Sequence, residues 1–356
     1  MSNCIEKGNK IAFHPGYYIK ELVESLELTQ EDFAKRLDTT PKNLSLLIRG
    51  EQSLSIDMAM KLSRMLGTSV SYWLNLQSAY DELVAEFKSE DVLQDEKHTF
   101  IALSYKYFKD NFGLPNLPRK IDEQIAQVRQ FLGVATLCVL ENRDMAVSFR
   151  SAIPELTNHN TIKANAMVQI ATNVAMKQDA PRYNKEKLLK AVEYALTLTT
   201  QHQTFYPLLR KAFIEAGVVL VVLPNLPGSN INGANKRVGD KIMLMVNDRR
   251  MNSDTFWFTL LHEIGHIING DYGISFDKEK GKIEEEADRF AEDALIDPAL
   301  YREFVAGGRF DCNAILAFAE RINRAPGIVV GRLENDGIVE YNKWELKPLR
   351  CQYKVC

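Results

Sequence analysis

The sequence of 356 residues lacks an apolar run long enough to cross a membrane, and its start, MSNCIEKGNK, lacks the hydrophobic segment of a signal peptide. Its five cysteines are scattered and contain no CxxC pair, a pattern typical of reduced thiols. An excess of one charge is also missing, since the formal net charge is −3 and residues 1–80 hold 9 basic and 9 acidic side chains. We therefore expect a cytoplasmic protein with no membrane partner, in which any contact with nucleic acid is local.

What is present is an ordinary globular composition, with 46% hydrophobic and 26% charged residues, and a length that predicts two or three domains. Apolar residues at helical spacing from Tyr17 to Leu76 predict a bundle of about five short helices. Residues 77 to about 112 also have a helical pattern, until the segment NFGLPNLPRK interrupts it. Residues 119–216 again predict mainly helices.

The residue pattern changes after Gly217, where the β-branched run VVLVVL and the later segment KIMLMVN predict two strands. The segment between them, PNLPGSNINGANKRVGD, is long enough for a short extra strand or a mobile flap. From Asp254 onward the helical pattern returns. The predicted fold class is therefore mainly α, with an α+β domain in the C-terminal part of the chain.

The segment FTLLHEIGHIING, residues 258–270, contains an HExxH motif. On a helix, His262 and His266 lie one turn apart on one face, the spacing with which two imidazoles reach one tetrahedral metal at about 2.0–2.1 Å. Glu263 is placed to act as the general base, while the metal lowers the pKa of water toward 7. The alternative is a surface helix with two incidental histidines, because a chance HExxH is expected in roughly one such chain in a hundred.

The next predicted helix, IEEEADRFAEDALID, offers a third ligand. Glu284 falls on the shoulder of its apolar stripe, and a carboxylate on the buried side of a helix is costly unless it is paired or metal-bound. Asp288, one turn on, can accept a hydrogen bond from a ligand histidine. The alternative is that the glutamates form a solvated first turn favoured by the helix dipole. The stripe consists of Ile283, Ala287, Phe290, Ala291, Ala294 and Leu295.

Residues 205–335, with the HEIGH motif, the strand KIMLMVN before it and the helix EEEADRFAEDALI after it, resemble the ImmA/IrrE family of zinc peptidases. In that family the second helix has the form ExxA(N/D)xFA. The resemblance implies a zincin-like metallopeptidase domain with a small sheet, in which His262, His266 and Glu284 hold Zn²⁺ and Glu263 is the catalytic base. It also implies that the strand before the zinc helix pairs with the substrate backbone. The family usually ends the second helix in LLMP, whereas this chain has ALIDP, a departure that removes no ligand.

The segment LTQEDFAKRLDTTPKNLSLLIRG has the pattern of a helix-turn-helix. Thr29 and Thr40 are placed as N-caps of two helices over residues 30–37 and 40–48, with a tight turn between them. In that motif the N-terminal residues of the second helix face the bases of the major groove. The alternative is a helical packing module without a role on DNA. The candidate DNA contacts are Gln30, Thr40, Pro41, Lys42, Asn43, Ser45 and Arg49.

Residues 13–82, from HPGYYIKEL through SYWLNLQSAYD, resemble the HigA-type antitoxin subgroup of the XRE helix-turn-helix family. The resemblance implies a homodimer on a palindromic operator of double-stranded DNA, and a cognate toxin or repressor as protein partner. Asn43 is suited to adenine, and Lys42 to guanine or phosphate. The atypical segment PKNLSLLIRG leaves the operator sequence open. His14 is expected to have a structural or capping role.

The expected domains are a helix-turn-helix domain at 1–82, a helical connecting region at 83–204, a metallopeptidase domain at 205–335 and a tail at 336–356. The expected function is that of a DNA-binding transcriptional regulator, of the toxin–antitoxin or phage-repressor type, whose zinc endopeptidase domain cleaves a repressor or antitoxin. The alternative is a non-enzymatic antitoxin or repressor whose peptidase-like domain senses a signal or binds a protein. The segment NAILAFAERINRAPGIVVGRLEND is expected to pack on the peptidase core, with a second helix-turn-helix as the alternative.

Overall fold

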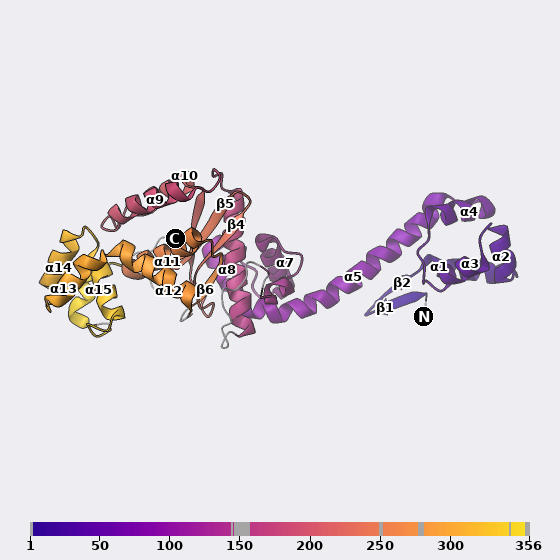
Figure 1. Ribbon diagram of the computed structural model, residues 1–356. Coiled ribbons are helices and arrows are strands. Elements are labelled where there is room, and N and C mark those ends of the chain that lie inside the picture. The colour runs from indigo at the N-terminus through magenta and orange to yellow at the C-terminus, as the bar shows by residue number, and fades with distance from the viewer. Residues whose placement is uncertain are drawn as a thin grey trace. The chain divides into compact units, whose positions relative to one another are not determined.

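The computed structural model describes residues 3–143, 145, 157–248, 252–276, 281–341 and 343–352 (Figure 1). The chain divides into two compact units, Met1–Asp95 and Glu96–Cys356. Each unit has its own cluster of buried apolar side chains. Within the described residues, no helix combines the length and the apolar character that a membrane span requires.

The first unit is a helical bundle preceded by a small hairpin. The hairpin pairs β1 (Cys4–Lys7) with β2 (Lys10–Phe13) in antiparallel register, and strands this short carry too little alternation to be predicted from the sequence. The expected five helices are present, although the last continues far beyond the bundle. They are α1 (Pro15–Ser25), α2 (Gln30–Arg36), α3 (Pro41–Ile48), α4 (Ile56–Leu66) and α5 (Val70–Leu103).

Side-chain caps fix the starts of these helices. Thr29 Oγ1 accepts a hydrogen bond from the backbone N–H of Asp32 at 3.1 Å, and Thr40 Oγ1 accepts one from the N–H of Asn43 at 3.2 Å. Both caps confirm the predicted N-termini of α2 and α3. His14 Nδ1 accepts from the N–H of Gly16 at 3.0 Å, which confirms the capping role expected of this histidine.

The second unit contains a four-stranded sheet and most of the helices. Its strands are β3 (Val218–Pro224), β4 (Ile231–Val238), β5 (Lys241–Asp248) and β6 (Gly273–Phe276), in the spatial order β3-β5-β4-β6. Its helical segments are α6 (Tyr105–Phe112), α7 (Ile121–Leu132), η1 (Leu137–Glu141), α8 (Asn158–Lys177), α9 (Lys185–Thr197), α10 (Phe205–Glu215), α11 (Ser253–Asn269), α12 (Lys282–Leu295), α13 (Pro298–Ala306), α14 (Cys312–Arg321), α15 (Pro326–Asn335) and η2 (Trp344–Leu349). The predicted class, mainly α with a small sheet in the C-terminal part, is confirmed.

The order of the strands corrects one expectation. The strand before the zinc-motif helix, β5, pairs with β3 in parallel along one edge and with β4 in antiparallel along the other. Its backbone hydrogen-bonding groups are therefore used within the sheet, and β5 cannot pair with a substrate as the family resemblance implied. The segment between the two predicted strands resolves into β4, a full strand, rather than a flap.

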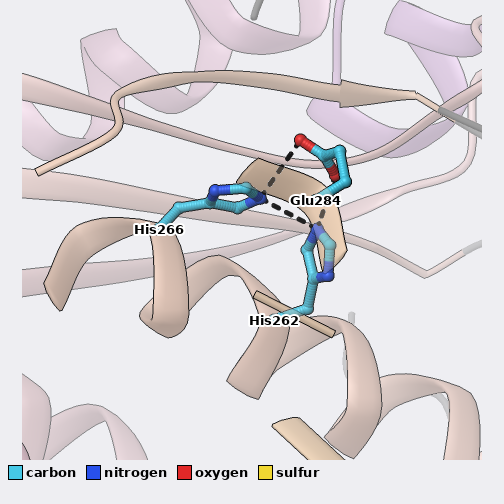
Figure 2. Close-up of side chains that lie close together, drawn as sticks. All are labelled: His262, His266 and Glu284. Atoms are coloured by element: carbon cyan, nitrogen blue, oxygen red, sulfur yellow. Dashed lines mark hydrogen bonds and ion pairs between the residues drawn. The ribbon is translucent and has the colours of Figure 1, made fainter. Parts of the chain in front are cut away.

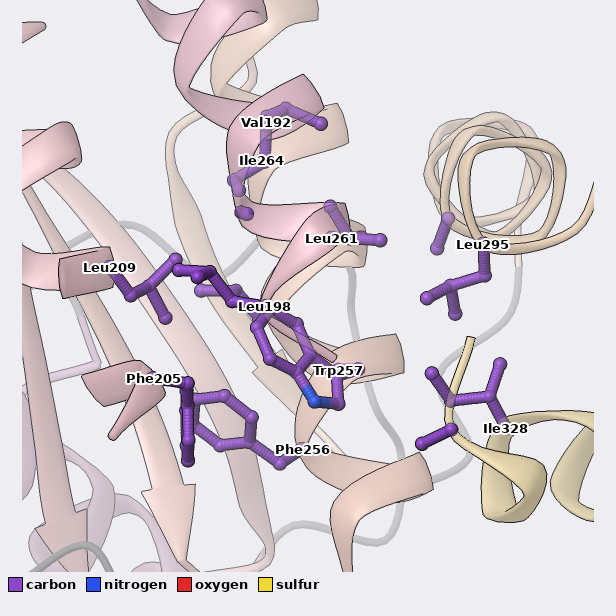
Figure 3. Close-up of a cluster of buried hydrophobic side chains, with 14 of the residues drawn as sticks. Val192, Leu198, Phe205, Leu209, Phe256, Trp257, Leu261, Ile264, Leu295 and Ile328 are labelled. Atoms are coloured by element: carbon purple, nitrogen blue, oxygen red, sulfur yellow. The ribbon is translucent and has the colours of Figure 1, made fainter. Parts of the chain in front are cut away.

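The sheet is covered by helices on both faces (Figure 1). Helix α8 packs on β3, β4 and β5. Helix α10 packs on β3, and α11 packs on β4 and β5; their apolar side chains form part of the core shown in Figure 3. The apolar side chains of α11, among them the buried Trp257, belong to this core. Phe205 of α10 and Ile328 of α15 belong to it as well. Helices α14 and α15 contribute Phe318 and Val329 to the same core, which confirms that residues 312–335 pack on it.

Because each unit has its own core, the stability of the first unit can be tested separately from that of the second. Leu44, on α3, is fully buried, and Leu44→Ala is expected to lower the free energy of opening of residues 30–66 by about 2–5 kcal/mol because it leaves a cavity. Hydrogen exchange of the full chain, read by mass spectrometry of peptides, measures this local loss. Leu26, 47% exposed, provides the matched control Leu26→Ala. Faster exchange in residues 205–335 of the Leu44→Ala variant would contradict independent cores.

Candidate metal centre and adjoining groove

Helix α11 carries the HExxH motif in its C-terminal half. It ends at Gly270, whose φ of 83° is the left-handed conformation that stops a helix, as the sequence predicted. His262 and His266 are both buried and project from the same face, so that their Nε2 atoms lie 3.0 Å apart. Two imidazoles therefore converge on one point inside the protein (Figure 2).

A close approach of α12 to α11 brings the third side chain to this point. Gly265, between the two histidines, has no side chain, and a Cβ built there would lie 3.2 Å from Ala287 Cα and 3.3 Å from Phe290 Cβ. A glycine facing a small residue thus lets the two helices pack closely, since a Cβ at position 265 would have to displace α12 by a few tenths of an ångström. Glu284 lies one turn before Ala287 on α12, so the contact sets its carboxylate beside the imidazoles.

The burial of α12 corrects the predicted apolar stripe. Ile283 is 42% exposed and takes no part in the core, whereas Glu284 is only 6% exposed. The buried face instead runs through Glu284, Ala287, Ala291 and Leu295. Glu284 thus lies on the buried stripe itself rather than on its shoulder, while Glu285 is exposed as predicted.

The three side chains have the separations that a tetrahedral metal requires. Glu284 Oε2 lies 3.1 Å from His262 Nε2, and Glu284 Oε1 lies 3.4 Å from His266 Nε2. An ion bonded at about 2.0–2.1 Å to each ligand separates two tetrahedral ligands by about 3.3 Å. In the part of the chain that the structure describes, these residues are the one group of three or more such side chains able to hold a metal. Two nitrogens and one carboxylate oxygen are also the donor set that zinc accepts.

Asp288 forms a hydrogen bond with the ring nitrogen of His262 that does not face the cluster. Its Oδ1 lies 2.8 Å from His262 Nδ1. Burial lowers the pKa of His262, but hydrogen bonds with Asp288 and Glu284 and the charge of Glu263 outweigh burial and raise it to about 9. Burial also raises the pKa of Glu284, and the contacts with His262 and His266 hold it well below its ordinary range. The cluster is therefore an array of charges that stabilise one another.

Glu263 is fully buried and faces the sheet rather than the solvent. Its Oε2 accepts a hydrogen bond from Asn235 Nδ2 at 2.7 Å, and Asn235 also reaches its backbone carbonyl at 3.3 Å. Gly233, two residues before Asn235 and on the same face of β4, makes room for this carboxylate, because a Cβ there would lie 2.5 Å from Glu263 Oε1. Neither residue was predicted, since the sequence pattern left NGANKRV in an irregular segment.

A groove of about 580 Å³ opens beside the metal centre. Helix α11 lines it with Thr255, Phe258, Thr259 and His262, and the facing side of α12 lines it with further acidic residues. Helix α15 also lines it, together with Tyr341 and Arg350. The groove therefore connects the candidate metal ligands to a second group of charged side chains, which the sequence did not predict.

One pair of carboxylates in the groove shares a guanidinium from the C-terminal segment. Arg350 Nη2 lies 3.0 Å from Asp254 Oδ2 and 2.6 Å from Glu334 Oε2. The side chains of Arg350 and Asp254 are 12% and 10% exposed, so this contact is largely removed from water. A glycine, Gly331, faces Asp254, and a Cβ there would lie 2.8 Å from Asp254 Oδ2.

The second guanidinium of the groove is shared in the same way. Arg332 Nη2 lies 3.1 Å from Glu292 Oε2, and Arg332 Nε lies 2.9 Å from Asp336 Oδ2. Tyr301 donates its hydroxyl proton to Asp336 at 2.6 Å. Burial and the neighbouring Asp336 together raise the pKa of Tyr301 well above its ordinary value, which keeps it a donor. Each guanidinium of the groove is thus divided between two carboxylates.

The candidate DNA contacts lie on the surface of the first unit. Leu44, Leu47 and Ile48 hold one side of α3 in the core, and the opposite side faces outward. Arg49 is exposed, donates to Ser45 Oγ at 3.0 Å and pairs with Glu51 at 2.9 Å. Ser45 is half-buried. The other five, all exposed, are Gln30, Thr40, Pro41, Lys42 and Asn43.

Comparison with known proteins gives a family match within each of the two units. Residues 19–73 match the family model described as helix-turn-helix, and residues 218–322, which include the HExxH motif and Glu284, match the model described as an IrrE N-terminal-like domain. The chain is 39% identical over 85 residues to the HTH-type transcriptional regulator YddM of Escherichia coli K12, covering 23% of this chain and 89% of that protein. It is 30% identical over 93 residues to virulence-associated protein I of Dichelobacter nodosus, covering 26% of this chain and 86% of that protein.

Among solved structures, an addiction module antidote protein of a HigA family from Coxiella burnetii is 31% identical to this chain. That match covers 24% of this chain and 94% of the other, with a TM-score of 0.22. Both resemblances expected from the sequence motifs are confirmed. The chain belongs to the family of HTH-type transcriptional regulators, and its second unit carries an IrrE N-terminal-like domain.

Proposed function

We propose that this regulator is also a zinc-dependent endopeptidase, which cleaves a repressor-type or antitoxin-type protein and so couples proteolysis to transcription. The observation that carries the proposal is the convergence of His262, His266 and Glu284 within 4.8 Å of one another. The buried Glu263 beside them, and the groove that opens on His262, supply the remaining parts of a peptidase site. We propose residues 205–335 as the extent of this domain.

Each residue of the cluster has a defined role in the proposal. His262, His266 and Glu284 hold the metal, and Asp288 fixes the ring orientation and tautomer of His262 through Nδ1. A zinc ion bound there would supply Lewis acidity, which polarises a peptide carbonyl and lowers the pKa of water toward neutrality. Glu263 takes the proton of the attacking water and passes it to the leaving amine. Asn235 keeps the carboxylate of Glu263 in position for both transfers.

The first unit supports binding to double-stranded DNA as a homodimer. The exposed N-terminal residues of α3 are those that reach base edges in a helix-turn-helix. The charge balance of residues 1–80 leaves little general attraction to DNA, so affinity depends on local contacts and on the doubling of the site in a dimer. We propose a toxin or repressor protein as the second partner, in keeping with the antidote proteins that the chain resembles.

Removal of the proposed base separates metal binding from cleavage. Glu263→Gln is expected to retain about one zinc per chain and to lose cleavage by a factor of about 10³ or more, because water then lacks its proton acceptor. Zinc is measured by mass spectrometry of protein purified without chelator, and cleavage by fragments of the product of the neighbouring gene. The exposed Glu285 provides the matched control, Glu285→Gln, which retains both properties.

Two results would contradict these assignments. Zinc near zero in the unaltered chain would exclude the metal centre. If the unaltered chain and Glu263→Gln were equally inert while both repressed their own promoter, the domain would be a binding or sensing module rather than an enzyme.

The glycine of β4 provides a more selective test of the base. In Gly233→Ala, the added Cβ would lie 2.5–2.8 Å from the carboxylate group of Glu263, so this side chain must move. We expect kcat to fall by about 10²-fold with the zinc content unchanged, because the added Cβ meets Glu263 and none of the three proposed ligands. Metal analysis and steady-state kinetics are compared on the same preparation. Unchanged kcat would show that the position of Glu263 does not matter for cleavage.

The proposed role of α3 in DNA binding is tested by removing one charged side chain and one amide side chain. Lys42→Ala and Asn43→Ala are each expected to weaken binding to the DNA upstream of the protein's own gene by about 1–3 kcal/mol, because each removes one contact in each half-site. Fluorescence anisotropy at several salt concentrations is the measurement, and Lys106→Ala, an exposed lysine of the second unit, is the control. Equal affinities of all three variants would exclude α3 as the recognition helix.

A further inference from the structure

Strand β4 contains a β-bulge at Asn232. Ile231 is paired with Phe276 of β6. Gly233, two residues on, is paired with Ser275, which is only one residue from Phe276. Asn232 is therefore the extra residue, and the ladder between β4 and β5 likewise begins only at Gly233. A bulge breaks the strict alternation of side chains between the two faces of a sheet, so Asn232 need not point to the face opposite Gly233.

The bulge lies beside the proposed catalytic base. The backbone of Gly233 is so close to Glu263 that a Cβ at this glycine would lie 2.5 Å from Glu263 Oε1. Asn232 is the adjacent residue, with its Cα about 3.8 Å from that of Gly233. Asn232 also lines the groove, together with His262 and Glu284. It thus belongs to the wall of the groove next to the candidate metal centre.

The side chain of Asn232 has no hydrogen-bond partner among the residues that the structure describes. Two asparagines nearby are used within the fold. Asn235 Nδ2 donates to Glu263 Oε2 at 2.7 Å, and Asn247 Nδ2 donates to the backbone carbonyl of Ile231 at 2.7 Å. Asn232, by contrast, is only partly buried and lines the groove. Its donor and its acceptor are therefore available to a molecule that enters the groove.

A polypeptide in the groove needs partners for its main chain. An extended segment presents peptide N–H and C=O groups, and each one that leaves water without a partner costs about 1–3 kcal/mol. Strand β5 cannot supply these partners, because both of its edges are paired within the sheet. The amide of an asparagine carries one acceptor oxygen and an NH₂ donor, which together complement the N–H and C=O of peptide groups. Asn232 is thus chemically matched to a main chain rather than to a particular side chain.

We propose that Asn232 binds the main chain of the polypeptide substrate beside the bond to be cleaved, with Nδ2 donating to a peptide carbonyl and Oδ1 accepting from a peptide N–H. The proposal rests on the proposed peptidase function and specifies how its substrate is held. It also narrows the substrate class to extended segments. A helix already uses its N–H and C=O groups internally and has none to offer to this amide.

The test measures binding rather than cleavage. The full chain with Glu263→Gln, with zinc present, first selects the most enriched peptide from an equimolar mixture of blocked, randomised octapeptides. Esters then replace the peptide N–H groups of this probe one at a time. We expect one ester to raise Kd about tenfold, a change of about 1.4 kcal/mol, because it removes the N–H that Asn232 accepts. When Asn232→Ala is added, the same ester is expected to raise Kd by no more than about twofold, because its partner is already gone.

Asn269 provides the matched control. It is exposed at the C-terminal end of α11 and does not line the groove, so Asn269→Ala is expected to keep the full effect of the ester. Asn232→Leu, which matches asparagine in size, replaces the alanine variant if that one folds poorly. With Glu263 intact, Asn232→Ala is expected to raise KM about tenfold with the zinc content unchanged, because a contact made before and during the reaction is lost.

Three results would overturn the role of Asn232. They are the absence of any enriched peptide, the absence of a sensitive ester in Glu263→Gln, and an ester effect that persists in Asn232→Ala. Loss of the ester effect in Asn232→Ala, in a chain that never yields fragments, would refute the peptidase alone. Fragments from a substrate whose esters are insensitive to Asn232→Ala would refute the role of Asn232 alone.

Discussion

The close packing of α11 on α12 at Gly265 and Ala287 is the constraint on which the whole site depends. A glycine in the middle of a helix costs about 1 kcal/mol relative to alanine, so its place between the two histidines of the motif is unfavourable for α11 alone. What it permits is a helix separation at which Glu284 reaches both imidazoles. Gly233 has the equivalent effect on the opposite side of α11, where β4 must come close to Glu263. Two positions without side chains thus set the two distances on which the proposed site depends.

The same packing buries four ionisable groups inside an apolar core. His262, Glu263, His266 and Glu284 are each less than 10% exposed, and isolated charges in such a place would cost several kcal/mol apiece. Mutual pairing offsets part of this cost, since the carboxylate of Glu284 contacts both imidazoles. The remainder is compensated by the apolar side chains that anchor α11 from the other side, among them Trp257 (Figure 3). A divalent cation among these groups would stabilise the fold as well as provide reactivity, because it binds the folded arrangement in preference to the unfolded chain.

Local features of this protein could be predicted from its sequence, and contacts between distant segments could not. The caps of α2 and α3, the end of α11 at Gly270 and the pairing of two histidines follow from spacing within one helix. Glu284 could also be found, because the periodicity of its own helix places it toward the core. The roles of Gly233 and Asn235 depend on the strand order, and the glycine and asparagines of NGANKRV weaken the alternation that marks a strand. The expectation for β5 came from the family resemblance and is wrong because β5 lies inside the sheet.

Residues 350–352, which fall in the segment expected as a tail, pack against the start of the zinc-motif helix. The N–H of Ser253 donates to the carbonyl of Cys351 at 2.9 Å, and the side chain of Asn252 accepts from Gln352 at 3.2 Å. The first of these bonds satisfies one N–H of the first turn of α11, whose N–H groups lack partners within the helix. Both bonds also fix Arg350 where it meets Asp254. The segment that caps the helix therefore also contributes a guanidinium to the groove, so a domain that ended at residue 335 would omit part of the groove's lining.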